Sequence, residues 1–252
     1  MISWPATVVL SVLPVALLAL GLLAPRVVPW WDFLMGLGLA AAGGLIVLPV
    51  VTARFWRRTG HTAEYMTAIH HLHRYLSFGL GAAVLVHTAG FLVLDSLTIE
   101  YIKISAPGYM LSGLVSGVLL IVLTVTSLFR LQWSIRYPAW RRWHAILSAL
   151  TLALMLHHLI GAGYYFDTLW KSAGLMFAAL IPTAISLQGS ASERSAHVAS
   201  PVDADAMPEI QVGRRTAFAM LALWLFAAAL FAIPNDLETD EEEVACASLA
   251  CT

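Results

Sequence analysis

Long apolar runs, separated by short polar stretches, dominate the chain. A helix needs about 20 apolar residues to cross the roughly 30 Å hydrocarbon core of a bilayer, because each residue rises about 1.5 Å. Candidate spans lie at 4–24, 30–53, 68–95, 108–129, 140–161 and 168–187, and a seventh begins at 216. No segment alternates between apolar and polar residues as a half-buried strand would. The pattern predicts an all-α integral membrane protein with seven spans.

The polar stretches divide this chain into parts of different character. We expect a six-helix body at 1–187, a polar cytoplasmic linker at 188–215, a seventh transmembrane helix at 216–234 and an acidic tail with two cysteines at 235–252. The linker is rich in Ser, Ala and Pro and cannot bury a core. The first span lacks a positive start and exceeds the usual apolar length of a signal peptide, so we expect it to be retained.

Composition supports a membrane protein and excludes several other classes. Of the 252 residues, 60% are hydrophobic and only 12% are charged, whereas soluble domains carry about 25% charged residues. The net charge is −1 and no basic block is present, so we expect no nucleic-acid partner. The cysteines, Cys246 and Cys251, both lie in the tail and cannot cross-link the bundle.

Positive residues gather on one side of the predicted spans. Ten of the 14 Lys and Arg residues lie in the loops after the second, fourth and sixth spans: Arg54, Arg57, Arg58, Arg130, Arg136, Arg141, Arg142, Arg194, Arg214 and Arg215. Cytoplasmic loops carry such an excess. We therefore expect a lipid-embedded, multi-pass protein of the bacterial inner membrane, with a cytoplasmic N-terminus and a periplasmic C-terminus.

Histidines lie within the third and fifth spans, where an ionisable side chain is costly and marks a functional site. His73 and His87 are 14 residues apart, about 21 Å along a helix and about 40° around it. In the fifth span, His144 is followed by His157 and His158. Both spans run in the same direction across the membrane. His73 should therefore lie level with His144, and His87 level with either His157 or His158.

Two histidines that face each other inside a bundle can ligate a haem iron from both sides. Two such levels would hold two b-type haems. The carboxylates of the body lie at predicted helix ends or in loops, which disfavours a proton relay or a cation transporter. The CxxCH signature of covalently attached haem is absent.

Residues beside these histidines fit the same hypothesis. Haem propionates need cations, and Arg74 follows His73 while Arg142 precedes His144. Both arginines have an alternative interpretation as ordinary cytoplasmic-side charges. Gly79 and Gly81, midway between the third-span histidines, would let a flat macrocycle approach the backbone; the alternative is close helix packing.

The chain resembles the ferric reductase-like transmembrane domain family, which includes NADPH oxidases, ferric reductases and the haem subunit of a bacterial periplasmic methionine sulfoxide reductase system. The resemblance lies in HRYLSFGLGAAVLVHTAGFLVLD (73–95), ISAPGYMLSGLVSGVLLIVLTVTSLFR (104–130) and WRRWHAILSALTLALMLHH (140–158). It implies a haem-binding bundle whose iron ligands are His73, His87, His144 and His157. The family's spacing favours His157, whereas ideal helix geometry favours His158, which we retain as a cofactor-binding alternative.

One departure from the family affects the expected partners. NADPH oxidases and ferric reductases follow the sixth helix with flavin and nicotinamide domains, whereas here a polar linker and another helix follow. We therefore expect a haem subunit of a membrane complex that exchanges electrons with separate donor and acceptor proteins or with a quinol. The alternatives are a quinol-oxidising cytochrome of the b561 type and a non-redox structural subunit whose histidines only pack.

Overall fold

The computed structural model describes residues 27–51, 63–130 and 132–191, together with the separate residues 16, 218, 219, 221, 222 and 225. The elements in chain order are α2 (Pro29–Val51), α4 (Ala63–Leu94), the 3-10 helix η1 (Ser96–Ile102), α5 (Gly108–Phe129), α6 (Tyr137–Ala162) and α7 (Leu169–Ala191). No strand occurs in this part of the chain. The predicted all-α class is confirmed for the described residues.

Four of the described helices, α2, α4, α5 and α6, are long and apolar enough to cross a membrane. The protein is therefore a multi-pass membrane protein. The apolar part of α7 is shorter, Leu169–Leu180, and α7 itself continues four residues into the predicted linker. The predicted first span lies outside the described residues except for Ala16, and only five residues of the predicted seventh span are described. The seventh transmembrane helix stays a prediction.

The helix boundaries follow from local chemistry. Helix α5 has the bounds predicted from the apolar run, and Pro107 precedes it as N-cap. Helix α6 has a proline in its first turn, where the missing N–H costs nothing and the fixed φ suits a helix. It ends at Gly163, whose φ of +67° is left-handed and strongly favours glycine.

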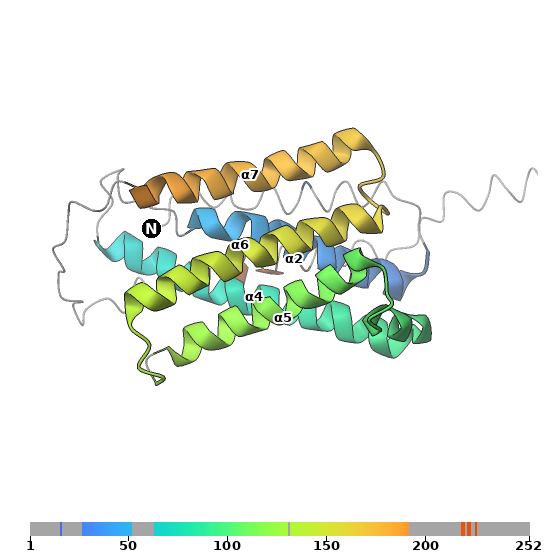
Figure 1. Cartoon of the computed structure of the whole chain (residues 1–252), viewed down its shortest axis with the longest axis horizontal. Helices are drawn as coiled ribbons and strands as arrows, with labels where there is room; N and C mark the ends of the chain where they lie inside the picture. The colour runs from blue at the N-terminus through green and yellow to red at the C-terminus, as the bar shows by residue number, and fades with distance from the viewer. Residues whose placement is uncertain are drawn as a thin grey trace, which may run out of the picture.

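Successive long helices run antiparallel along the length of the bundle (Figure 1). Helix α2 packs along α4 and α7, while α5 packs along α6. Helices α4 and α6, which carry the histidines, run in the same direction, as predicted. Their backbones make only sparse contact in the described part of the chain, so side chains fill the interval between them.

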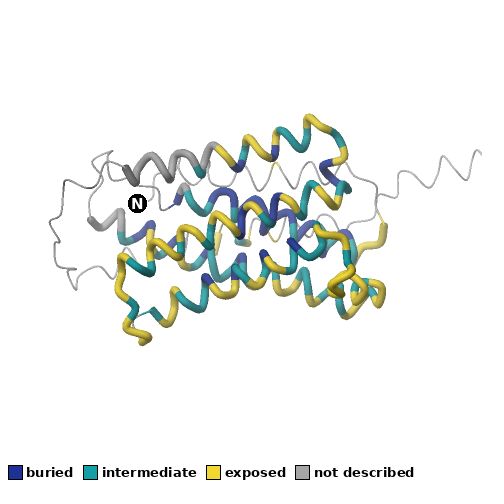
Figure 2. Tube along the Cα trace, viewed as in Figure 1, coloured by how far each residue is buried: buried dark blue, intermediate teal, exposed yellow. Residues whose placement is uncertain are grey.

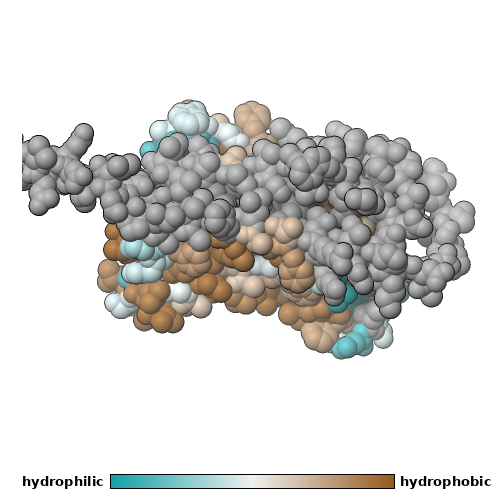
Figure 3. Space-filling model, turned by 180° about the vertical axis from the view of Figure 1, so that it is seen from behind, coloured by the Kyte–Doolittle hydropathy of each residue, from teal (hydrophilic) through white to brown (hydrophobic). Residues whose placement is uncertain are grey.

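The core is centred on α2, most of whose spanning segment is buried (Figure 2). Small residues at Ala40, Ala41 and Ala42 let the neighbouring helices approach it closely. In α4, α5 and α6 most of the spanning residues are not buried within the bundle. Hydrophobic residues cover the middle of the described surface in Figure 3, and hydrophilic ones lie toward its ends. This surface suits contact with lipid.

Candidate metal centre

The first histidine pair joins α4 to α6 near the end of the bundle where α6 begins. The ring centroids of His73 and His144 are 6.5 Å apart, at an interplanar angle of 63°. A metal held about 2 Å from one nitrogen of each of two imidazoles would separate the ring centroids by about 6 to 6.5 Å. The predicted level pairing of these two residues is present, and its spacing fits a single metal ion between the rings.

Both rings of this inner pair lie against neighbouring helices. The His73 ring lies near the backbone of Leu48 in α2, and its Nδ1 is buried without a hydrogen-bond partner. His144 Nδ1 lies 3.4 Å from the Ser127 hydroxyl of α5. A metal-binding histidine typically uses one nitrogen for the metal and the other for such an anchor. The unpartnered nitrogen of His73 therefore fits a ligand role.

The second pair lies one histidine spacing further along the same helices. His87 Nδ1 is 2.8 Å from the backbone carbonyl oxygen of Leu34, and His158 Nδ1 is 3.0 Å from that of Tyr109. A carbonyl oxygen only accepts, so both Nδ1 atoms carry hydrogen and each Nε2 is the nitrogen that can bind a metal. The two imidazoles are near enough for their charges to interact.

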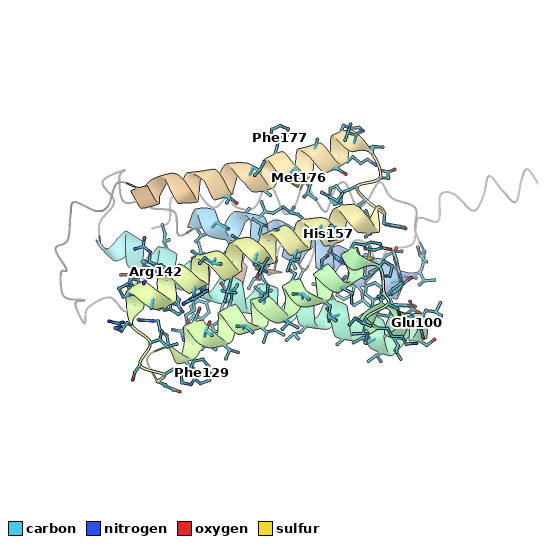
Figure 4. All side chains as sticks on the ribbon, viewed as in Figure 1. Glu100, Phe129, Arg142, His157, Met176 and Phe177 are labelled. Carbon is cyan, nitrogen blue, oxygen red and sulfur yellow. The ribbon has the colours of Figure 1, made fainter. Side chains whose placement is uncertain are left out.

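His157 is placed differently from its neighbour. Its exposed ring has Nδ1 2.9 Å from the hydroxyl of Ser112, a buried residue of α5. Figure 4 shows His157 toward the C-terminal end of α6. Helix α6 is one continuous helix whose only proline lies in its first turn. In a helix without a kink, His158 follows His144 by 14 residues and lies on nearly the same face. His157 lies about 100° around the helix from His158.

Two glycines that the sequence did not single out make room for the outer rings. A Cβ atom at Gly38 would lie 2.8 Å from the His87 ring, and one at Gly113 would lie 2.6 Å from the His158 ring. Each glycine follows the anchoring carbonyl, at Leu34 or Tyr109, by four residues. The carbonyl and the glycine therefore lie on the same helix face, one turn apart.

The glycines predicted from the sequence have other surroundings. A Cβ atom at Gly79 would meet the side chain of Leu221, whereas one at Gly81 would meet no atom within 4 Å. Gly79 therefore serves close packing against a residue of the predicted seventh span. A role for Gly81 beside a macrocycle stays a prediction.

Charged residues divide between the two ends of the bundle. Arg74 and Arg142 are both exposed, and the Arg74 guanidinium lies over the Phe78 ring at 5.9 Å. Figure 4 shows Arg142 and Glu100 at opposite ends of the bundle. At the end with Glu100, Lys171 donates to Asp167 at 2.6 Å, which lowers the pKa of that carboxyl. The predicted propionate contacts of the two arginines stay a prediction.

The donor set restricts the kind of metal that this arrangement can bind. Within the described residues, no group of three or more His, Cys, Asp or Glu side chains is placed to hold a metal ion. Paired imidazoles alone supply only two ligands. A metal that brings its own equatorial nitrogens, as haem iron does, needs no more than these two from the protein. The residues therefore fit haem better than a bare metal ion.

A family model described as "Ferric reductase like transmembrane component" matches residues 37–156. The resemblance predicted from the sequence is confirmed over these residues. These residues are similar to a ferric reductase-like transmembrane domain, which suggests a membrane electron-transfer component. The match contains His73, His87 and His144 and ends just before His157 and His158.

No curated protein matches the chain, and no solved structure matches it. The family match therefore indicates the general class of function and does not extend to His157 or His158.

Proposed function

We propose that the protein passes electrons across the bacterial inner membrane through two b-type haems, each held by two histidines. His73 and His144 hold the inner haem, and His87 and His158 hold the outer one. The observation that carries this proposal is the 6.5 Å separation of the His73 and His144 rings. The similarity of residues 37–156 to the ferric reductase-like class gives independent support.

We prefer His158 to His157 as the partner of His87. His158 has the anchored Nδ1 and the partly buried ring expected of a ligand, and its charge would be felt at His87. His157 is exposed and hydrogen-bonded to Ser112. The equal spacing also favours His158, since 14 residues separate the two histidines on each helix.

The protein's own residues have three tasks in this function. The histidines would hold the iron of each haem, and backbone carbonyls of α2 and α5 orient the two outer rings. Apolar side chains around them exclude water: Leu76 and Leu80 of α4, with Met155 and Leu156 of α6, belong to one buried cluster. When bound, haem supplies an iron that accepts and releases one electron. Repeated at two levels about 21 Å apart, this arrangement suits electron transfer through the bilayer.

The arginine-rich end is the cytoplasmic side in this proposal, so the N-terminus is cytoplasmic and the C-terminus periplasmic. The seventh span, part of which touches α4 through Phe218 and Leu221, completes the membrane domain. Electrons come from and go to separate proteins or a quinol, and the chain works as a subunit of a membrane complex.

The test is haem quantitation on the purified full chain, by the pyridine haemochrome assay and a reduced-minus-oxidised spectrum. We expect two b haems per chain. His73→Ala and His144→Ala should each reduce the content to one, because an iron that loses one axial imidazole is held less tightly. The remaining haem then reports that the variant has folded.

A wild-type chain without haem would overturn the proposal and favour the structural-subunit alternative. Two haems retained in both variants would show instead that haem binds elsewhere in the chain. Reduction of the haem-loaded chain by a quinol alone, with no added protein, would identify the quinol as the electron donor.

A further inference from the structure

Trp140 carries a buried polar atom that has no part in holding the iron in the proposed function. Its indole Nε1 is buried and has no hydrogen-bond partner. Because a buried donor that lost its water without gaining an acceptor is costly, such atoms usually have a partner in the working protein. The indole ring lies 4.8 Å from the His144 ring, centroid to centroid, at 32°. Trp140 is therefore in direct contact with a proposed iron ligand.

The surroundings of this indole are positively charged. The Arg130 guanidinium lies over the Trp140 ring at 5.4 Å and over the Tyr137 ring at 5.3 Å. Arg130 forms no ion pair with a carboxylate of the described residues. Among the described carboxylate side chains, Asp95 and Glu100 belong to η1 and its cap, Asp167 precedes α7, and Asp32 in the first turn of α2 accepts from the Val27 N–H; these segments lie at the opposite end of the bundle. The site thus combines a buried N–H donor with a cation and calls for an anion.

We propose that Trp140 Nε1–H and Arg130 bind a propionate carboxylate of the inner haem. This inference rests on the proposed function, because it needs haem at His73 and His144. Trp140 precedes His144 by four residues, so it lies about one helical turn, roughly 6 Å, nearer the cytoplasmic end on the same face. A haem held at His73 and His144 with its propionates toward the cytoplasmic side would bring a carboxylate to this turn.

The ordinary role of a membrane tryptophan does not account for Trp140. Tryptophans at a bilayer interface direct their N–H to headgroups or water. Trp143, three residues along α6, is 64% exposed and suits that role. The nitrogen of Trp140 is shielded from solvent. Trp143 is therefore a matched control of the same residue type on the same helix.

The test compares Trp140→Phe with Trp143→Phe in the full chain carrying His158→Ala, in which the inner haem alone is expected. Phenylalanine keeps an aromatic ring against His144 and removes the N–H donor. We expect haem to leave the Trp140→Phe protein for excess apomyoglobin about tenfold faster than the Trp143→Phe protein, because hydrogen bonds to charged acceptors are strong. Arg130→Gln should act in the same direction.

Ultraviolet resonance Raman gives a second readout, because the indole bands report hydrogen bonding at N–H. The band contributed by Trp140, obtained as the difference from the Trp140→Phe protein, should shift when haem is added to the apo-protein. Equal haem loss from both tryptophan variants, or a hydrogen-bonded Trp140 before haem is added, would overturn this inference and indicate water or lipid as the partner. If the His158→Ala protein with both tryptophans holds no haem, the proposed function itself fails.

Discussion

The two histidine pairs are built from the same helices but are anchored in different ways. At the outer level, His87 and His158 each meet a backbone carbonyl at 2.8–3.0 Å, and a glycine lies against each ring. At the inner level, His144 has only a long contact of 3.4 Å to a serine hydroxyl and a tryptophan ring packed against it at a tilt. The outer rings are thus fixed by backbone, and the His144 ring mainly by side chains.

The difference between the two levels arises on α5, the helix that packs against α6. Leu34 and Leu48 of α2, which contact His87 and His73, are separated by the same 14 residues as the histidines. Because α2 and α4 are antiparallel, one face of α2 lies beside both histidines of α4. Helix α5 repeats the arrangement for α6 only at the outer level, through Tyr109. A backbone carbonyl cannot be removed by changing a side chain. We therefore expect haem binding at the outer pair to be weakened by bulk added beside the rings, and haem binding at the inner pair to be weakened by removing a side-chain group that contacts a ring.

The largest expected effect separates the two adjacent histidines of α6. His158→Ala should remove the outer haem and leave one haem per chain, whereas His157→Ala should keep two. The reason is that only His158 combines a backbone anchor with proximity to His87. Haem quantitation with a redox titration of each variant measures the outcome. The opposite pattern would make His157 the ligand, as the family's spacing predicts.

A smaller effect is expected from the glycines beside the outer rings. Gly113→Ala would put a methyl group 2.6 Å from the His158 ring, well inside a normal contact of about 3.5 Å. Such overpacking costs about 1–3 kcal/mol, so the outer haem should be lost faster than the inner one. Gly38→Ala should act likewise through His87.

Gly81→Ala is the control for these glycine variants, because its new methyl group would meet no atom within 4 Å. The haem content and the rate of haem loss should stay as in the unchanged chain. If Gly81→Ala instead released haem, the macrocycle would lie against Gly81, as the sequence suggested. If Gly113→Ala retained both haems unchanged, the outer ring would be less firmly fixed than its contacts indicate.

The helices and the inner pair were predictable because both depend on regular spacing. An apolar run gave the exact bounds of α5, and the positions of His73 and His144 on parallel helices determined their level. Whether His157 or His158 faces His87 depends on whether α6 is kinked. A run of apolar residues in the sequence does not show where a helix kinks. The structure has α6 unbroken.

The supporting residues were harder to predict because they lie on other helices. Gly79 and Gly81 were chosen for their place between two histidines of α4, but the room that a glycine makes depends on which helix packs against it. Gly38 and Gly113 face the rings from α2 and α5. Trp140 resembles any interfacial tryptophan in the sequence, and only its burial distinguishes it from Trp143.

The smallest expected effect concerns the side-chain anchor of the inner pair. The Ser127 hydroxyl donates to the Leu123 carbonyl at 2.6 Å, so it can only accept a weak hydrogen bond from His144 at 3.4 Å. Ser127→Ala should therefore weaken inner haem binding by about 0.5 kcal/mol or less, measured in the His158→Ala background. Thr126→Val, which removes a hydroxyl bonded to Val122, is the control. Loss of the inner haem in Ser127→Ala alone would show that this long contact anchors His144 as firmly as a carbonyl anchors His158, and the contrast between the two levels would disappear.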